Sequence, residues 1–226
     1  MISLVRKKRE ATPLNEGTDT RIKRSKPVRF APSSLGQTGI YQPMQKDPQE
    51  KILDDRPKED NNIPPISLLY DGFGRFLDIF AGDTNVEGVN DVKVSELQFA
   101  VDEFAQLMCG FFDVEYQMRD KGLTALNKIF AARKDGSGPT LAVGAIGSVM
   151  TDGHYTGPHG VVTMISEFKN DITGIATIPE VELVGYFAHS FSEELDKHSR
   201  LDGWRVPGLG ITIVGMGWML VDSILC

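Results

Sequence analysis

Cysteine is scarce in this chain of 226 residues, which contains only Cys109 and Cys226. No C-x-x-C pair occurs, so the sequence excludes a structural zinc site built on thiolate ligands. Two cysteines that lie so far apart also do not supply a disulfide framework, and this is typical of a protein in a reducing compartment.

Long apolar runs are also missing, which bears on secretion and membrane insertion. The opening "MISLV" is too short for the apolar part of a signal peptide, and the charged "RKKRE" follows it directly. The longest uncharged stretch near the C-terminus, residues 206–221, has 16 residues, of which five are Gly or Pro. A membrane-spanning helix needs about 20 apolar residues. We therefore expect a core segment here, no membrane partner and an intracellular location.

Aromatic residues are nearly absent from residues 1–62, which have only Phe30 and Tyr41. The segment is rich in Lys, Arg, Glu, Asp, Pro, Asn and Gln instead. Such a composition buries too little apolar surface to offset the entropy that a chain loses on folding. The sequence therefore predicts a disordered basic tail over residues 1–62 and a folded region over residues 63–226.

Charge is divided unevenly along the chain. Residues 1–30 contain nine Lys and Arg against three Asp and Glu, a net charge of +6, so the other residues carry −13 of the total of −7. Two basic clusters, Lys7–Arg9 and Arg21–Lys26, resemble a bipartite nuclear-localisation signal that binds acidic pockets of an import receptor. The alternative is a solvated charged tail. The acidic remainder argues against a broad affinity for nucleic acid.

Hydrophobic periodicity predicts the order of elements in the folded region. Apolar residues at helical spacing indicate a helical segment over residues 63–133, and a cluster of turn-forming residues follows it. The predicted elements follow in the order helices, strand, strand, helix and strand, which indicates an α/β fold with a mixed sheet. The chain ends in "ILC" within a predicted strand, which suggests a truncated gene model. The elements expected after the helical segment are strands at 140–150 and 160–169, a helix at 180–198, a strand at 209–214 and a second strand near the chain end.

A candidate active site lies where the most strand-like segment ends in charged residues. Alternate residues of a strand point to one face, so Glu167 and Lys169 share a face. Both faces before them are apolar, and buried charges are costly unless they are paired or bind a metal. Gly153 permits a tight bend that would direct Asp152 toward this strand. Carboxylate oxygens suit Mg²⁺ or Mn²⁺, and a nearby lysine can orient a water molecule or stabilise phosphoryl charge.

Other interpretations of these residues remain open. The charged pair at the strand end would be a simple ion pair in an interaction protein, and the acidic-x-Lys triplet at residues 91–93 shows how easily chance supplies this spacing. Asp152, His154 and His159 are a weaker candidate for a Zn or Mn site. The glycine-rich "GLGITIVGMG" lacks the third Gly of a dinucleotide-binding loop and the Gly-Lys of a phosphate loop, so it predicts a core strand.

Three segments together carry a resemblance to a known superfamily. They are "TDGH" (151–154), "MISEFKN" (164–170) and "PEVELVGY" (179–186), and they resemble the PD-(D/E)xK nucleases. More closely, the stretch from "GFGRFLDIF" to "GWRVPGLGITIVG" resembles a group of uncharacterised basidiomycete fungal proteins, in which such a module often precedes a protein-kinase-like domain. The resemblance covers roughly residues 63–221 and implies a restriction-endonuclease-like core of α-β-β-β-α-β order.

The resemblance also implies roles for individual residues. Asp152 and Glu167 would be metal ligands for Mg²⁺ or Mn²⁺, and Lys169 would be the catalytic lysine. Glu182 falls on the following helix, where the superfamily often has a catalytic Gln or Lys. A glutamate there departs from the pattern, and it would either add a metal ligand or mark lost activity.

Two further features are less well defined by the resemblance. Thr151 stands where the superfamily has the Pro of its "PD" half, a change that the superfamily tolerates. A carboxylate from the preceding helices is common in these nucleases, and either Glu115 or Glu103 could supply it.

The function expected from these residues is hydrolysis of phosphodiester bonds in DNA or RNA by a metal-dependent nuclease-like domain. The alternative is a catalytically inactive domain of the same fold that serves as a regulatory or interaction module of a fungal kinase-like protein. The acidic charge of the folded region and the glutamate at position 182 favour this alternative.

Overall fold

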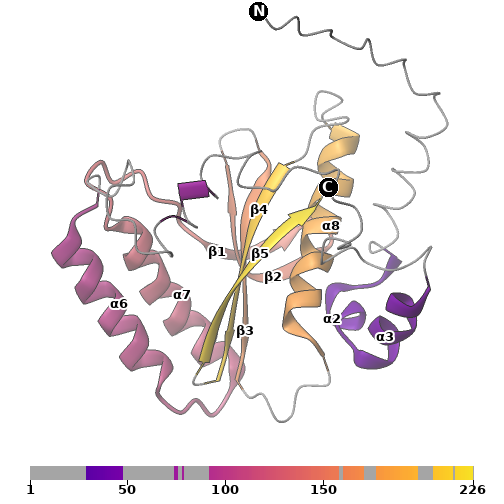
Figure 1. Ribbon diagram of the computed structural model, residues 1–226, viewed down its shortest axis with the longest axis horizontal. Helices are drawn as coiled ribbons and strands as arrows, with labels where there is room; N and C mark the ends of the chain where they lie inside the picture. The colour runs from indigo at the N-terminus through magenta and orange to yellow at the C-terminus, as the bar shows by residue number, and fades with distance from the viewer. Residues whose placement is uncertain are drawn as a thin grey trace, which may run out of the picture.

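The computed structural model describes most of the chain from residue 92 onward and a short N-terminal segment (Figure 1). For residues 191–197, 206–207 and 217–225, it describes the backbone alone. The described residues are 29–47, 74–75, 78, 92–157, 160–170, 177–197, 206–215 and 217–225.

A five-stranded mixed sheet forms the centre of the protein, and its strands follow one another in the order β1-β2-β3-β4-β5. The first three strands pair antiparallel, β3 and β4 pair parallel, and β4 and β5 pair antiparallel. A parallel pair needs a crossover, and the helix α8 supplies it between β3 and β4. The strands are β1 (Ala142–Ile146), β2 (Val149–Thr156), β3 (Val162–Lys169), β4 (Val206–Val214) and β5 (Gly217–Leu225).

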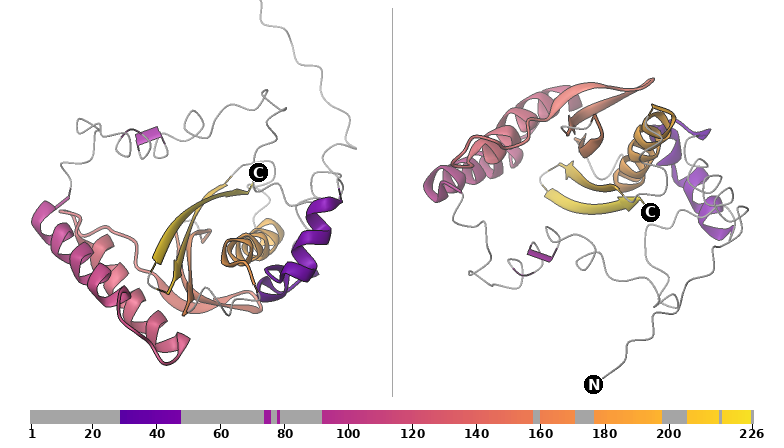
Figure 2. Two further views of the ribbon diagram at one scale, coloured as in Figure 1. Left: turned by 60° about the horizontal axis from the view of Figure 1, so that its bottom comes forward. Right: turned by 90° about the horizontal axis from the view of Figure 1, so that it is seen from above.

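Helices cover both faces of this sheet (Figures 1 and 2). The helices α6 and α7 lie side by side on one face, α8 lies on the other, and α2 and α3 pack on the outer side of α8. The sheet is therefore the middle layer of the fold, which is mixed α/β as expected. The helices are α2 (Pro32–Leu35), α3 (Thr38–Lys46), α6 (Val94–Met108), α7 (Glu115–Ala131) and α8 (Pro179–Lys197).

The strand β3 separates two apolar cores. Phe168 is fully buried on the α6–α7 side, where it packs with Ile213 of β4 and with buried residues of both helices. Ile165 is fully buried on the other side, against Leu183 and Phe187 of α8. Burial of one such side chain contributes about 1.5–3 kcal/mol. The strand is thus covered on both faces, as its apolar sequence predicted.

The region around Asp152 differs from the sequence-based expectation. The expected strand over residues 140–150 is two strands, because Gly147 takes a positive φ of 60° and turns the chain between β1 and β2. Asp152 and Gly153 lie inside β2, so the predicted bend at Gly153 is wrong. Gly153 instead provides room, since a Cβ atom there would lie 2.5 Å from the Ser166 side chain on the neighbouring strand.

The prediction of disorder over residues 1–62 is wrong for residues 29–47. They form α2 and α3, whose Leu35 and Met44 are buried against Val181 and Val184 of α8. These few apolar residues are enough to hold the segment in place because they pack on apolar residues that α8 already presents, Val181 and Val184. The rest of the expected tail, including both basic clusters, lies outside the described residues.

The described part of the expected helical segment, from residue 92 to residue 133, contains α6 and α7. The helical patterns expected before residue 92 fall almost entirely outside the described residues. In the part of the chain that the structure describes, no helix combines the length and apolar character that crossing a membrane requires.

Candidate functional site

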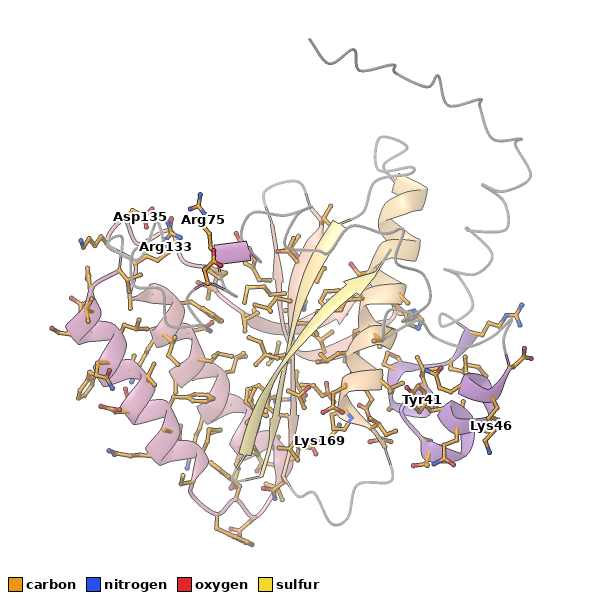
Figure 3. The ribbon with its side chains drawn as sticks, viewed as in Figure 1. Tyr41, Lys46, Arg75, Arg133, Asp135 and Lys169 are labelled. Atoms are coloured by element: carbon orange, nitrogen blue, oxygen red, sulfur yellow. The ribbon has the colours of Figure 1, made fainter. Side chains whose placement is uncertain are left out.

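Charged residues from four elements meet where β3 ends and α8 begins. Asp152 comes from β2, Glu167 and Lys169 from β3, Glu182 from the first turn of α8 and Glu115 from the first turn of α7. Figure 3 shows Lys169 at this end of the sheet. The amino ends of two helices point to the site, and a helix N-terminus stabilises nearby negative charge.

Lys169 is at the centre of this cluster. Its Nζ lies 2.6 Å from Oε1 of Glu167, 3.3 Å from Oε2 of Glu182 and 4.0 Å from Oε1 of Glu115. Burial opposes the positive charge of Lys169, but the neighbouring carboxylates outweigh that effect and hold its pKa above the ordinary value. Lys169 is therefore a fixed ammonium that holds together three carboxylates from three elements.

The Glu167 and Glu182 side chains are almost completely removed from solvent, with exposed fractions of 2% and 1%. Oε2 of Glu167 and Oε1 of Glu182 lack a hydrogen-bond partner among the described residues, and Oε2 of Glu182 has the ion-pair contact with Lys169. Thr212 pairs with Glu167 in the parallel register of β3 and β4, and its buried hydroxyl also lacks a hydrogen-bond partner there. Buried polar groups are normally satisfied, so these atoms have unused capacity to accept a hydrogen bond or to bind a cation.

Burial makes the negative charge of Glu167 costly. Its pKa is raised well above the ordinary value, first by desolvation and then by the nearby Asp152, while Lys169 acts in the opposite direction. A second positive charge at this point would stabilise the ionised carboxylate.

Asp152 is held in a defined orientation by the neighbouring strand. Its Oδ2 accepts a hydrogen bond of 2.9 Å from the backbone N–H of Phe168, and its Oδ1 lies 3.9 Å from Nη1 of Arg119 on α7. Burial raises the pKa of Asp152, although the Phe168 N–H, Lys169 and Arg119 oppose this. Asp152 therefore belongs to the same electrostatic cluster as Glu167, which is 15 residues later in the chain.

The structure distinguishes the two helix carboxylates that the sequence left open. Glu115 lies beside Lys169, whereas Glu103 forms a separate ion pair with Lys128 on the α6–α7 surface, at 2.6 Å. Burial raises the pKa of Glu115, and Lys169 partly offsets this effect.

The alternative site with two histidines is not formed by the described residues. Nδ1 of His154 lies 2.8 Å from the hydroxyl of Thr151, and His159 is outside the described residues. Among the residues that the structure describes, no three His, Cys, Asp or Glu side chains stand in an arrangement that could hold a metal ion. At the end of β3, the Lys169 ammonium is the cation that contacts Glu167 and Glu182.

Two residues near the cluster were missed in the sequence. Arg119 follows Glu115 by four residues on α7, and the buried Tyr186 follows Glu182 by four residues on α8. Burial and the four site carboxylates raise the pKa of the Tyr186 hydroxyl. Residues four apart share a helix face, so this spacing was the available signal.

Comparison with known proteins does not extend this description. No protein-family model matches the chain, and no curated protein and no solved structure is significantly similar to it. A functional conclusion therefore rests on the geometry and chemistry of the site.

Proposed function

We propose that this protein is a metal-dependent phosphodiesterase of the PD-(D/E)xK type, which acts on nucleic acid. One observation carries the proposal: Asp152, Glu167 and Lys169 share one charged cluster at the end of β3, where the buried Oε2 of Glu167 has no hydrogen-bond partner among the described residues. In support, the order α7-β1-β2-β3-α8-β4 agrees with the α-β-β-β-α-β order of a restriction-endonuclease-like core.

The charges of the cluster are suited to a divalent cation. Among the described residues, four carboxylates surround Lys169, and Arg119 lies 3.9 Å from Asp152 but pairs more closely with Asp120, so the fully ionised cluster carries an excess of at least two negative charges. Mg²⁺ and Mn²⁺ prefer carboxylate oxygens and retain several water ligands. Asp152 and Glu167 would hold the ion, and Glu182, held beside Lys169, would add a third carboxylate to the site.

The residues of the chain then have distinct roles. A bound cation would supply Lewis-acid stabilisation of a phosphoryl oxygen. Lys169, kept protonated by its carboxylate neighbours, would stabilise charge that develops on the phosphate and orient an attacking water molecule. The hydrogen bond from the backbone N–H of Phe168 would hold Asp152 in place as a ligand of the ion. Phosphodiesters are the substrate class that this combination of acidic ligands and a lysine suits.

Metal binding is the first test, because it does not depend on knowing the substrate. We expect calorimetry to detect Mn²⁺ binding by the full chain, and Asp152→Ala/Glu167→Ala to abolish it. The control is Asp102→Ala/Glu103→Ala, which removes the same two residue types from α6 and should bind Mn²⁺ like the wild type. A folded wild-type protein that binds no Mn²⁺ would refute the proposal.

Turnover provides the second test. Lys169→Met should reduce Mn²⁺-dependent cleavage of single-stranded DNA, duplex DNA and RNA by about 100-fold or more, because it removes stabilisation of the transition state, and it should still bind Mn²⁺. Lys128→Met, which breaks an exposed ion pair of the same residue types, should cleave at the wild-type rate. Equal rates for both variants would show that Lys169 is not catalytic.

A second candidate function is a catalytically inactive module that takes part in regulation or protein interaction, as in a fungal kinase-like protein. The ion pairs of Lys169 with Glu167 and Glu182 favour it, since they compensate buried charges without a metal. The acidic charge of the chain also gives little attraction for nucleic-acid phosphates. A folded protein with neither Mn²⁺ binding nor cleavage would support this candidate.

A further inference from the structure

The segment formed by residues 31–47, hereafter the N-terminal strap, is attached to α8 at the amino end of that helix. The backbone N–H of Ile178 donates a 2.7 Å hydrogen bond to the carbonyl of Gly36, and Gln37 and Thr177 form an antiparallel bridge. Further along α8, Nε2 of His189 lies 3.1 Å from the carbonyl oxygen of Phe30, directly before the strap. These contacts join parts of the chain that are about 140 residues or more apart.

The strap also has an apolar attachment. Leu35 is completely buried and packs with Met44 against Val181 and Val184 of α8. Figure 2 shows α2 and α3 beside α8, on the side away from α6 and α7. Val181 and Val184 flank Glu182 on the same helix, so the strap covers the part of α8 that contributes a carboxylate to the site.

Gly36 is the point of closest approach between the strap and that carboxylate. A Cβ atom at residue 36 would lie 2.6 Å from Cγ of Glu182 and 3.2 Å from its Oε1. Gly36 has φ of −64° and ψ of −16°, a conformation that alanine adopts readily. The glycine is therefore required for space and not for backbone conformation.

The packing of the strap against the Glu182 side chain explains two properties of Glu182. Its exposed fraction is 1% although it lies in the first turn of a helix, and its Oε2 is directed to within 3.3 Å of Lys169. A side chain that is packed on one side by the strap has few other orientations. Exclusion of water also strengthens the attraction between Glu182 and Lys169.

We propose that Gly36 is a positioning residue of the site: by its lack of a side chain it lets the strap close over Glu182 and fixes that carboxylate against Lys169. The strap then forms one side of the site, although it lies far from the site residues in sequence. The metal readout below rests on the proposed function, whereas the coupling between Gly36 and Glu182 does not.

The test uses the full chain with four variants: Gly36→Ala, Gly39→Ala, Glu182→Ala, and Gly36→Ala combined with Glu182→Ala. Gly39 is the matched control because a Cβ atom there would meet none of the described residues within 4 Å. We expect Gly36→Ala to fold and to weaken Mn²⁺ binding about tenfold, the size typical of residues that orient a metal ligand. Gly39→Ala should bind Mn²⁺ like the wild type.

Denaturant unfolding of the same variants in EDTA provides a readout that needs no metal. The loss of stability caused by Gly36→Ala should become clearly smaller in the Glu182→Ala background, because alanine at position 182 has no Cγ to displace. Equal losses in both backgrounds, or wild-type Mn²⁺ affinity in Gly36→Ala, would overturn the proposed role of Gly36. If the wild type binds no Mn²⁺, the proposed function fails, and the unfolding cycle alone decides the role of Gly36.

Discussion

Two lysine–glutamate pairs in this protein have the same separation between their charged atoms but different surroundings. Lys169 and Glu167 at the end of β3 are separated by 2.6 Å, and so are Lys128 and Glu103 on the α6–α7 surface. The side chains of the first pair are 17% and 2% exposed, and those of the second are 52% and 38% exposed. The distance between two charged atoms therefore does not by itself indicate how much an ion pair contributes to stability.

The difference lies in what each charge loses on folding. The surface pair remains in contact with water, so its net contribution is about 0–1 kcal/mol. The pair on β3 loses hydration. A second carboxylate, that of Glu182, adds to the negative charge that Lys169 must compensate. A protein retains such a costly arrangement most readily where the charges serve a function.

Removing the lysine of each pair should give the largest difference between them, and this difference is in the stability of the protein. Lys169→Met should lower the free energy of unfolding by about 3–5 kcal/mol in EDTA, since it leaves buried carboxylates uncompensated. Lys128→Met should change it by about 0–1 kcal/mol. Urea unfolding measures both values. If the protein binds metal as proposed, saturating Mn²⁺ should restore part of the loss in Lys169→Met, and similar losses in the two variants without metal would remove the distinction between the pairs.

The coupling energies of the two pairs should also differ in their dependence on salt. Raising NaCl from about 0.1 M to about 1 M shortens the Debye length from about 10 Å to about 3 Å. Double-mutant cycles with Lys→Met and Glu→Gln should show that the coupling of Lys128 with Glu103 falls toward zero in high salt. The coupling of Lys169 with Glu167 should persist, because salt screens a buried pair much less than an exposed one. A parallel decrease of both couplings would contradict the burial argument.

The smallest effect concerns Glu115, which is half exposed at the edge of the site. Burial raises its pKa above the ordinary 4.5, so the folded protein binds this proton more tightly than the unfolded chain. Above pH 4.5 the ionised side chain therefore costs the folded state free energy. Without metal, the stability of Glu115→Gln relative to the wild type should increase as the pH rises from 4.5 toward neutrality, by less than about 1 kcal/mol.

Urea unfolding at several pH values in EDTA measures this difference. Glu103→Gln is the control for the loss of one carboxylate from an exposed ion pair. A relative stability of Glu115→Gln that decreases with rising pH would show that Lys169, and not burial, dominates the environment of Glu115.

Much of the local structure could be predicted because it follows from residue periodicity. The helix over 180–198 and the strand over 160–169 match α8 and β3 closely, and the alternation along β3 correctly places Glu167 and Lys169 on one buried face. The expectation for Asp152 was less successful. The sequence showed an Asp-Gly pair and suggested a turn, but the close approach of β2 to β3 at Ser166 requires the glycine within a strand.

The presence of charged residues at the end of a buried strand could be predicted from residues 160–169 alone, since the alternation of side chains along a strand is a local property. The tertiary structure was needed to show that Glu115 and not Glu103 joins them, that the expected Glu182 contacts Lys169, and that the strap covers Glu182. The physical reason is that such contacts depend on how whole helices pack on the sheet. The burial and the charge of the site arise from that packing, and no short stretch of sequence contains it.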